Sequence, residues 1–254
     1  MDGRLLVAIL LLVIAGSTLA GTWGQQRRRL EGFDVDNVKS YVINMAKNKD
    51  RMVNFDASYK AAKFPHKYTR FEAVDGRNID ISPYVTPKVL SEIKTMDVTG
   101  VRLSDKHLTR GMIGCYLSHL EIYKDALMTG VDKAVIFEDD AELDPAMYGR
   151  LQAILNKSPG TPEYDIMLLG VICLDCDVPK AGFKRVNNFW GTHGYVITRT
   201  AMQAMLATLP IDQQIDWKMS DLIRQRKLSV YAVDPVIVEA GKFGTDVQMT
   251  VEEE

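Results

Sequence analysis

The chain has 254 residues and a formal net charge of −2 at pH 7. Hydrophobic residues make up 46% and charged residues 25% of it, which is the balance of a globular protein and excludes collagen-like, coiled-coil and wholly disordered chains. The chain lacks an overall positive charge, so we expect no nucleic-acid partner, and any phosphate-bearing ligand must be bound locally. Three cysteines are too few for a disulfide scaffold.

The N-terminus has the pattern of a targeting segment. Arg4 precedes an apolar run at 5–15, and the small residues Thr18 and Ala20, at the −3 and −1 positions, suit cleavage after Ala20. The run is short for a membrane span, so we predict that residues 1–20 are a signal peptide. An uncleaved signal anchor is the alternative, and only then do we expect membrane attachment. The arginines at 27–29 would lie on the lumenal side of an uncleaved anchor, which opposes the positive-inside rule and favours cleavage.

Beyond a linker at 21–38, strand and helix patterns alternate along the chain. Thr109 is a suitable cap for the clearest helix, which carries an apolar face and ends before Gly130. A loop-rich insert with one short helix at 87–94 covers residues 77–104. We predict strands at 39–45, 70–74, 133–137, 164–170, 194–198 and 228–233, and helices at 51–62, 109–128, 145–155, 200–209 and 212–226.

This alternation predicts an α/β fold of a single domain, with a mostly parallel central sheet flanked by helices. The run KAVIF at 133–137 is typical of a strand buried on both faces. It stops at Glu138, Asp139 and Asp140. Ligands of such sheets bind at the carboxyl ends of the strands, so this acidic triplet is a candidate site.

Three consecutive carboxylates raise one another's pKa unless a cation is present. A divalent metal such as magnesium or manganese removes that cost, and it coordinates one or two carboxylates together with substrate phosphates. A metal bridging a diphosphate also stabilises it as a leaving group. The alternative is a solvated turn after a strand, and the triplet alone does not decide between the two.

Two further motifs bear on the compartment. Asn156-Lys157-Ser158 is an N-glycosylation sequon. Cys173 and Cys176 form a C-x-x-C pair that we interpret as two small buried residues near a strand end, with a disulfide formed in an oxidising lumen as the alternative. A zinc site is not expected, because no second pair exists.

In eight segments that occur in family order, the chain resembles glycosyltransferase family 25, the family of procollagen galactosyltransferases and bacterial lipooligosaccharide galactosyltransferases. The run G-x-I-G-C-x-L-S-H followed by E-D-D is its most specific part. The segments are YVINM with Asp50-Arg51, AVDGRN, LTRGMIGCYLSHLEIYKDAL, VIFEDDAEL, YDIMLLG, FWGTHGYVIT, LPIDQQID and VYAVDPVIV.

The resemblance implies a GT-A-like fold, with residues 39–250 as the catalytic domain. It implies transfer of a hexose, usually galactose, from a UDP-sugar to a hydroxyl of a glycan or glycoprotein. The reaction would depend on a divalent metal, manganese above all, and would invert the anomeric carbon. From the N-terminal targeting segment, we expect the protein in the secretory pathway, in the endoplasmic reticulum or Golgi lumen or after secretion. The alternative is an inactive relative that only binds a sugar or a partner.

The resemblance also implies roles for the acidic residues. The last acid of a D-x-D-like motif binds the metal, which assigns Asp140. Glu138 would face the ribose or a metal-bound water, and Asp139 would support the turn. Asp75 and Gly76 correspond to the nucleotide side, where Gly76 would allow close approach to the ligand. Asp246 corresponds to an acidic position on the metal side.

An inverting transfer needs a base for the acceptor hydroxyl. Asp212 matches the Pro-x-Asp of the family, although a helix N-cap is an equal interpretation. Asp216, one turn further, is the second candidate, and His193 is a third catalytic candidate. His119 is expected to brace the sheet. The chain departs from many relatives at Met112, where they have Glu, and at Gln213, where they have an acid, and this puts the acceptor in doubt.

Overall fold

The computed structural model describes residues 38–64, 67–102, 104, 106–244 and 247. These residues belong to one compact unit that begins at Phe33. The signal segment 1–20 and most of the linker lie outside the described residues, as does Asp246. Within the described part, no helix is both long and apolar enough to cross a bilayer.

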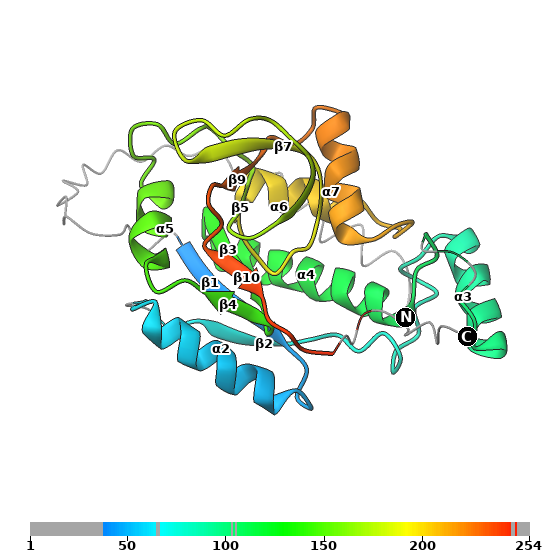
Figure 1. Ribbon diagram of the computed structural model, residues 1–254. Helices are drawn as coiled ribbons and strands as arrows, with labels where there is room; N and C mark the ends of the chain where they lie inside the picture. Colours follow the sequence, from blue (N-terminus) through cyan, green and yellow to red (C-terminus); the bar gives the residue numbers. More distant parts are fainter. Residues whose placement is uncertain (1–37, 65–66, 103, 105, 245–246, 248–254) are drawn as a thin grey trace, which may run out of the picture. The chain divides into compact units, whose positions relative to one another are not determined.

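An eight-stranded sheet forms the centre of the fold, in the order β2-β1-β3-β8-β5-β9-β7-β6 (Figure 1). Its strands are β1 (Val38–Asn44), β2 (Thr69–Glu72), β3 (Lys133–Glu138), β5 (Ile166–Leu168), β6 (Ile172–Cys176), β7 (Phe183–Trp190), β8 (Gly194–Thr198) and β9 (Val230–Val233). A second sheet pairs β4 (Ala141–Leu143) with β10 (Val238–Ala240). The helices are α2 (Lys49–Ala61), α3 (Pro87–Thr99), α4 (Arg110–Met128), α5 (Met147–Leu155), α6 (Arg199–Leu206) and α7 (Ile215–Arg224).

The α/β class and the single domain are confirmed, and the sheet is mixed. β1 runs parallel to β2 and β3, and β5 runs parallel to β9. β8 lies antiparallel between β3 and β5, and the β6–β7 hairpin extends the sheet antiparallel to β9. The local pattern of a buried strand does not encode its direction, so β8 was not distinguishable from its parallel neighbours in the sequence.

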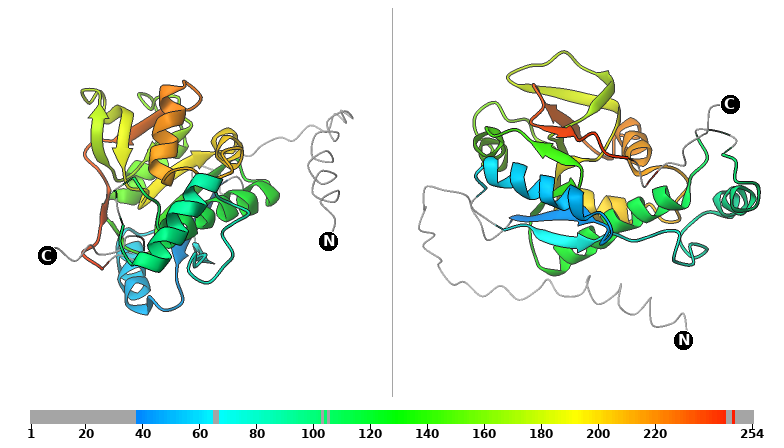
Figure 2. Two further views of the ribbon diagram at one scale, coloured as in Figure 1. Left: turned by 90° about the vertical axis from the view of Figure 1, so that its right-hand side faces the viewer. Right: turned by 60° about the horizontal axis from the view of Figure 1, so that its bottom comes forward.

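Helices cover both faces of the sheet, because successive residues of each inner strand point to opposite sides. In β3, Ile136 belongs to a cluster with α3, α4, α6 and α7, whereas Val135 and Phe137 belong to a cluster with α2 and α5. Figure 2 shows α2 and α4 as separate layers beside the strands. The apolar run 133–137 therefore forms the buried strand that its sequence predicts.

Several elements differ from the prediction. The helix expected at 212–226 begins only at Ile215, so the interpretation of Asp212 as its N-cap is wrong: Gln214 holds that position. The β6–β7 hairpin and the small β4–β10 sheet were not predicted. Their strands are short or partly exposed and lack a clear apolar alternation.

Cys173 and Cys176 lie half-buried on edge strand β6, and their sulfur atoms are joined in a disulfide. The interpretation as two small buried residues is therefore wrong and the disulfide alternative is the one observed; Cys115 is the free cysteine of the described chain. Asn156, the sequon asparagine, is exposed at the C-terminal end of α5.

The first turn of α4 is held in place by its own cap and by glycines. The Thr109 hydroxyl accepts a hydrogen bond from the Met112 backbone N–H at 3.1 Å, which confirms the predicted cap. A Cβ at Gly76 would lie 1.9 Å from the Arg110 carbonyl oxygen, and one at Gly114 would lie 2.3 Å from the Val74 carbonyl oxygen. The segment after β2 can therefore cross α4 only where both chains carry glycine.

Candidate active site

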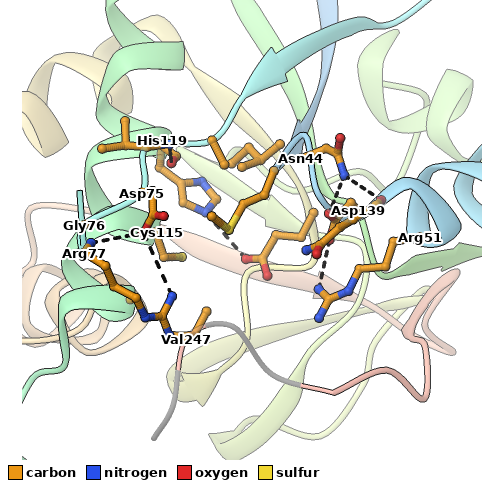
Figure 3. A pocket seen from close by; sticks show the side chains of 17 residues that line it. Asn44, Arg51, Asp75, Gly76, Arg77, Cys115, His119, Asp139 and Val247 are labelled. Carbon is orange, nitrogen blue, oxygen red and sulfur yellow. Dashed lines mark hydrogen bonds and ion pairs between the residues drawn. The ribbon is translucent and has the colours of Figure 1, made fainter. Parts of the chain in front are cut away.

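The acidic triplet lies where the sequence predicts it, at the carboxyl end of β3. Figure 3 shows its middle member, Asp139, beside Asn44 and Arg51. The end of β1, the residues before β8 and the first turn of α7 approach the same place. The three acids have different surroundings, and these surroundings suggest different roles.

Asp139 is the structural member of the triplet. It is buried, and its carboxylate accepts hydrogen bonds from Asn44 Nδ2 at 2.7 Å and from Arg51 Nη1 at 3.0 Å. Asn44 also accepts a hydrogen bond from Arg70 Nε at 2.8 Å through its side-chain oxygen. Asp139 thus ties the turn after β3 to the end of β1, which supports the expectation that it holds the turn.

Asp140 is the member of the triplet whose ionised form is disfavoured by its surroundings. Burial, the neighbouring Glu138 and Asp139 together raise the pKa of Asp140 to about 7, against the opposing charge of Arg51. The nearest Arg51 nitrogen lies 3.9 Å from Asp140 Oδ2, and the buried Asp140 Oδ1 has no hydrogen-bond partner among the described residues. An unsatisfied carboxylate oxygen in this position is suited to a divalent cation.

Glu138 is held by a chain of buried polar groups. Its Oε1 accepts a hydrogen bond from the Thr192 hydroxyl at 2.5 Å and lies 3.5 Å from His119 Nε2. On the other side of the imidazole ring, His119 Nδ1 lies 2.7 Å from the Tyr195 hydroxyl. Burial works to raise the pKa of Glu138, but His119 and Thr192 outweigh it and the net direction is downward. His119 therefore contacts this acid as well as bracing the sheet.

Asp216 faces the triplet from the first turn of α7. Its carboxylate accepts hydrogen bonds from the backbone N–H of Gly191 at 3.1 Å and of Trp217 at 2.8 Å. Burial raises the pKa of Asp216, partly offset by these hydrogen bonds. Asp216 lines one cleft together with Glu138, Asp140 and His193. We call this cleft, which has a volume of about 490 Å³, the α7 cleft.

His193 is packed closely against glycine backbone. A Cβ at Gly170 would lie 2.4 Å from His193 Nε2, and one at Gly191 would lie 3.0 Å from His193 Nδ1. Burial lowers the pKa of His193, which favours the neutral ring, although the Glu138 charge opposes this shift. The ring therefore has a fixed position in the α7 cleft.

Asp212 lies elsewhere. Its carboxylate pairs with Lys218 Nζ at 2.5 Å and is about half-exposed. It lines an outer cavity beside α3, whose other members include Lys88, His107 and Trp217. The structure therefore brings Asp216 and His193 to the acidic triplet and does not bring Asp212 there.

A second cavity, which we call the β1 cavity, adjoins the α7 cleft at Glu138 and is also lined by Asp139. It contains Asp75 and Gly76, as well as Asn44 and Arg77 (Figure 3). Asp75 accepts hydrogen bonds from the Arg77 backbone N–H at 3.0 Å and from Asn78 Nδ2 at 2.8 Å. Gly76 permits a close approach of its segment to helix α4. Packing within the fold therefore requires a glycine here, whether or not a ligand also binds.

Cys115, His119 and Glu138 also come close together, with one potential ligand atom of each within 4.8 Å of the others. This trio does not fit manganese or magnesium, which prefer oxygen ligands. Burial and nearby carboxylates raise the pKa of the Cys115 thiol, so it stays protonated. Among the described residues, Asp140 fits a hard cation best, with Glu138 beside it.

Sequence reasoning missed Asn44, Arg51 and Cys115 as members of the site. Asn44 and Cys115 occur within the motifs quoted above, but nothing in the local pattern shows that β1 and α4 converge on β3. Met112, which stands where many relatives have Glu, also contacts the N-cap residue of α4. Its sulfur accepts a hydrogen bond from the Thr109 backbone N–H at 3.4 Å.

Two cavities thus meet at the acidic end of a central strand of an α/β fold. The sequence pattern described as "Glycosyltransferase family 25 (LPS biosynthesis protein)" matches residues 37–173, more than half of the chain. The chain belongs to glycosyltransferase family 25. This match includes the triplet and Asp75, whereas His193, Asp212 and Asp216 lie beyond it.

Curated relatives extend the similarity further along the chain. Procollagen galactosyltransferase 2 of Homo sapiens is 23% identical over 231 residues, which cover 82% of this chain and 35% of the relative. A Drosophila melanogaster glycosyltransferase 25 family member is 26% identical, covering 69% of this chain and 28% of the relative. A Bos taurus protein named "Probable inactive glycosyltransferase 25 family member 3" is 25% identical, covering 72% and 30%.

This chain therefore spans about a third of the length of these relatives. Among solved structures, A197 from STIV aligns with a TM-score of 0.43 and 12% identity, covering 80% of this chain and 84% of that one.

Proposed function

We propose that the protein transfers a hexose, galactose in the first instance, from a UDP-sugar to an acceptor hydroxyl, with inversion and with the help of a divalent metal. The observation that carries the proposal is the buried Asp140 oxygen at the end of β3, which lines the α7 cleft and has no hydrogen-bond partner among the described residues. Membership of family 25 supports the same reaction class.

The β1 cavity, with a volume of about 70 Å³, is smaller than a nucleoside, so it is proposed to receive one edge of the nucleotide. Its lining includes two polar side chains, Asp75 and Arg77, that can form hydrogen bonds with a nucleoside. Gly76 belongs to the same wall. Glu138 lines both cavities, so a donor that reaches from the nucleotide side toward the α7 cleft passes this carboxylate.

Asp140 is proposed to hold the metal, with manganese as the first candidate and with Asp246 as a further ligand from outside the described residues. When bound, the cation would neutralise the charge of the departing diphosphate. Asp139 would not coordinate, because Asn44 and Arg51 already occupy its carboxylate.

Asp216 is proposed as the base, in preference to Asp212. A carboxyl whose pKa is raised by burial is a stronger base, and Asp216 shares the α7 cleft with the acidic pair. As the acceptor oxygen forms its bond to the anomeric carbon, the bond from that carbon to the diphosphate breaks, and the hydroxyl proton passes to an Asp216 carboxylate oxygen. His193 would orient the acceptor or the sugar from the same cleft.

The secretory pathway is proposed as the compartment. The signal-peptide pattern at 1–20 and the Cys173–Cys176 disulfide support it, because disulfides persist in oxidising compartments. The exposed sequon at Asn156 agrees with this assignment.

The second candidate function is binding without turnover. This candidate is supported by the relative named as inactive, because the chain is as similar to it (25% identical) as to the named galactosyltransferase (23% identical). It predicts that a UDP-sugar binds and that no product appears on long incubation with any acceptor.

The test is UDP release from a panel of UDP-sugars with manganese and several acceptors, together with calorimetry of donor and metal binding. Asp140→Asn should lower turnover by about 100-fold or more and abolish manganese binding. Asp144→Asn is the matched control, because Asp144 is an exposed acid of the following loop, and it should stay within about twofold. Full activity in Asp140→Asn would overturn the metal assignment.

A further inference from the structure

The α7 cleft has an aromatic wall that the chemistry above does not use. Trp190, at the end of β7, is 45% exposed although it lines this cleft. Its cross-strand partner in the hairpin is Ile172, which is 56% exposed and lines the same cleft. Large apolar side chains left open beside carboxylates cost hydrophobic free energy, so a ligand that covers them is expected.

This wall is tied directly to the proposed base. The residue after Trp190 is Gly191, whose backbone N–H donates to the Asp216 carboxylate at 3.1 Å. Gly191 has φ of +92°, a conformation that favours glycine, and it leaves no room for a side chain beside His193. Trp190 is therefore linked to the Asp216 carboxylate through the backbone of a single residue, Gly191. A ligand that packs on the indole is held beside the base.

The charges of the cleft restrict the ligand. Its acidic members are Glu138, Asp140 and Asp216, and Arg102 is the basic residue among the described lining. Even with a divalent cation at Asp140, this lining does not favour a phosphorylated or carboxylated acceptor. The ligand that fits is neutral, with an apolar face for the indole and hydroxyl groups at its edge for Asp216 and His193. A hexopyranose ring has this chemistry, because its C–H groups form a face and its hydroxyls form the rim.

The position of the cleft also agrees with an acceptor. In an inverting transfer the acceptor attacks from the side opposite to the departing diphosphate. Glu138 and Cys115 line both the β1 cavity and the α7 cleft, so the two cavities adjoin at Glu138. With the nucleotide in the β1 cavity, the acceptor enters through the α7 cleft, past Trp190.

Resting on the proposed function, we propose that the acceptor is a neutral glycan, whose terminal hexopyranose stacks on Trp190 and directs a hydroxyl to Asp216. Trp190 is then a residue that determines acceptor specificity. The Cys173–Cys176 disulfide lies on β6 next to the wall, between Ile172 and the hairpin turn.

The first experiment measures sugar contact without turnover. Saturation-transfer difference NMR is recorded on the full chain with UDP, manganese and methyl β-galactoside, methyl β-glucoside or methyl N-acetyl-β-glucosaminide as probes. At least one glycoside should give a signal at its ring C–H protons that is lost in Trp190→Ala and kept in Trp190→Phe. Leu174→Ala is the control, because Leu174 is an exposed apolar residue of the same hairpin that does not line the cleft.

The second experiment uses turnover with the best acceptor of the panel. Trp190→Ala should raise the KM for the acceptor by about tenfold, with a much smaller change in the KM for the UDP-sugar. An equal rise in the KM for the acceptor and in the KM for the UDP-sugar would indicate a structural role of Trp190 and would overturn the proposal.

The two proposals fail separately. A glycoside signal that depends on Trp190, without any UDP release, would overturn the transferase and leave the sugar subsite standing. Turnover that is insensitive to Trp190→Ala, or a hydroxylysine peptide that replaces the glycosides as the Trp190-dependent ligand, would overturn the subsite alone.

Discussion

Asn44 Nδ2 donates a hydrogen bond of 2.7 Å to the Asp139 carboxylate, and this bond joins the ends of two neighbouring parallel strands. Because Asn44 and Arg51 occupy the middle acid, Glu138 and Asp140 are the members of the triplet that face the cleft. The division of roles within three consecutive acids thus depends on a residue 95 positions earlier in the chain.

The Asn44 bond should be worth a measurable part of the stability. Asn44→Ala leaves the buried Asp139 carboxylate with one fewer donor and removes the acceptor of Arg70, so we expect a loss of about 2–3 kcal/mol in the free energy of unfolding. Urea denaturation measures it. Asn78→Ala, which removes a hydrogen bond at an exposed turn, is the control and should cost less than about 0.5 kcal/mol. Equal losses in the two variants would contradict the role of Asn44.

The assignment of the base separates two aspartates that lie four positions apart in sequence. Asp216→Asn should lower kcat by about 100-fold or more with little change in the KM for the donor, because it removes the proton acceptor but keeps the shape of the side chain. Asp212→Asn should stay within a few-fold of the natural protein. Steady-state kinetics with a saturating acceptor decides between them, and the reverse pattern would show that Asp212 is the base.

The crossing of the 73–77 segment over α4 should tolerate no side chain. In Gly114→Ala the new Cβ would lie 2.3 Å from the Val74 carbonyl oxygen and 2.7 Å from the Gly76 backbone nitrogen. We expect a loss of about 3 kcal/mol or more, since two backbone segments must move apart.

Gly149→Ala is the matched control for that prediction. Gly149 is also a helical glycine, it lies on the exposed side of α5, and a Cβ there has no neighbour within 4 Å. This variant should be neutral or more stable by about 0.5–1 kcal/mol, because alanine loses less backbone entropy. Thermal unfolding measures both variants. Equal melting temperatures for Gly114→Ala and Gly149→Ala would contradict the packing argument.

Asp125 predicts a pH dependence of stability. Burial works to raise its pKa, but Lys39 Nζ at 2.8 Å and the Tyr41 hydroxyl at 2.6 Å outweigh it, and the net direction is downward. A carboxyl with a lowered folded-state pKa stabilises the fold above its unfolded-state pKa of about 4, and that stabilisation is lost as pH falls through the folded-state pKa.

The comparison is Asp125→Asn, measured by urea denaturation between pH 3 and pH 7. The natural protein should be more stable by about 0.5–1 kcal/mol near neutral pH, a modest value because the pair is partly exposed and screened. The difference should shrink below about pH 4. A difference that stays constant over the whole range would mean that the charge of Asp125 contributes nothing.

Much of the fold was accessible from the sequence, because burial leaves a local pattern. The run at 133–137 has strand length and is apolar throughout, and the 109–128 segment has both a cap and an apolar face. Edge elements such as β6 and β10 were missed, since short, half-exposed strands bury too little to leave a pattern. The direction of β8 was also out of reach, because a strand buried on both faces has the same composition in either direction.

By itself, the sequence determined the α/β class, the acidic end of β3 and the family, because each depends on residues that lie close together in the chain. Only the tertiary structure decided which carboxylate faces the cleft. Asp212 and Asp216 both stand near the start of one helix, and their roles depend on where α7 begins and on the Gly191 N–H that meets Asp216 from β7. A contact between segments 25 residues apart is a property of the packed chain, and no local pattern contains it.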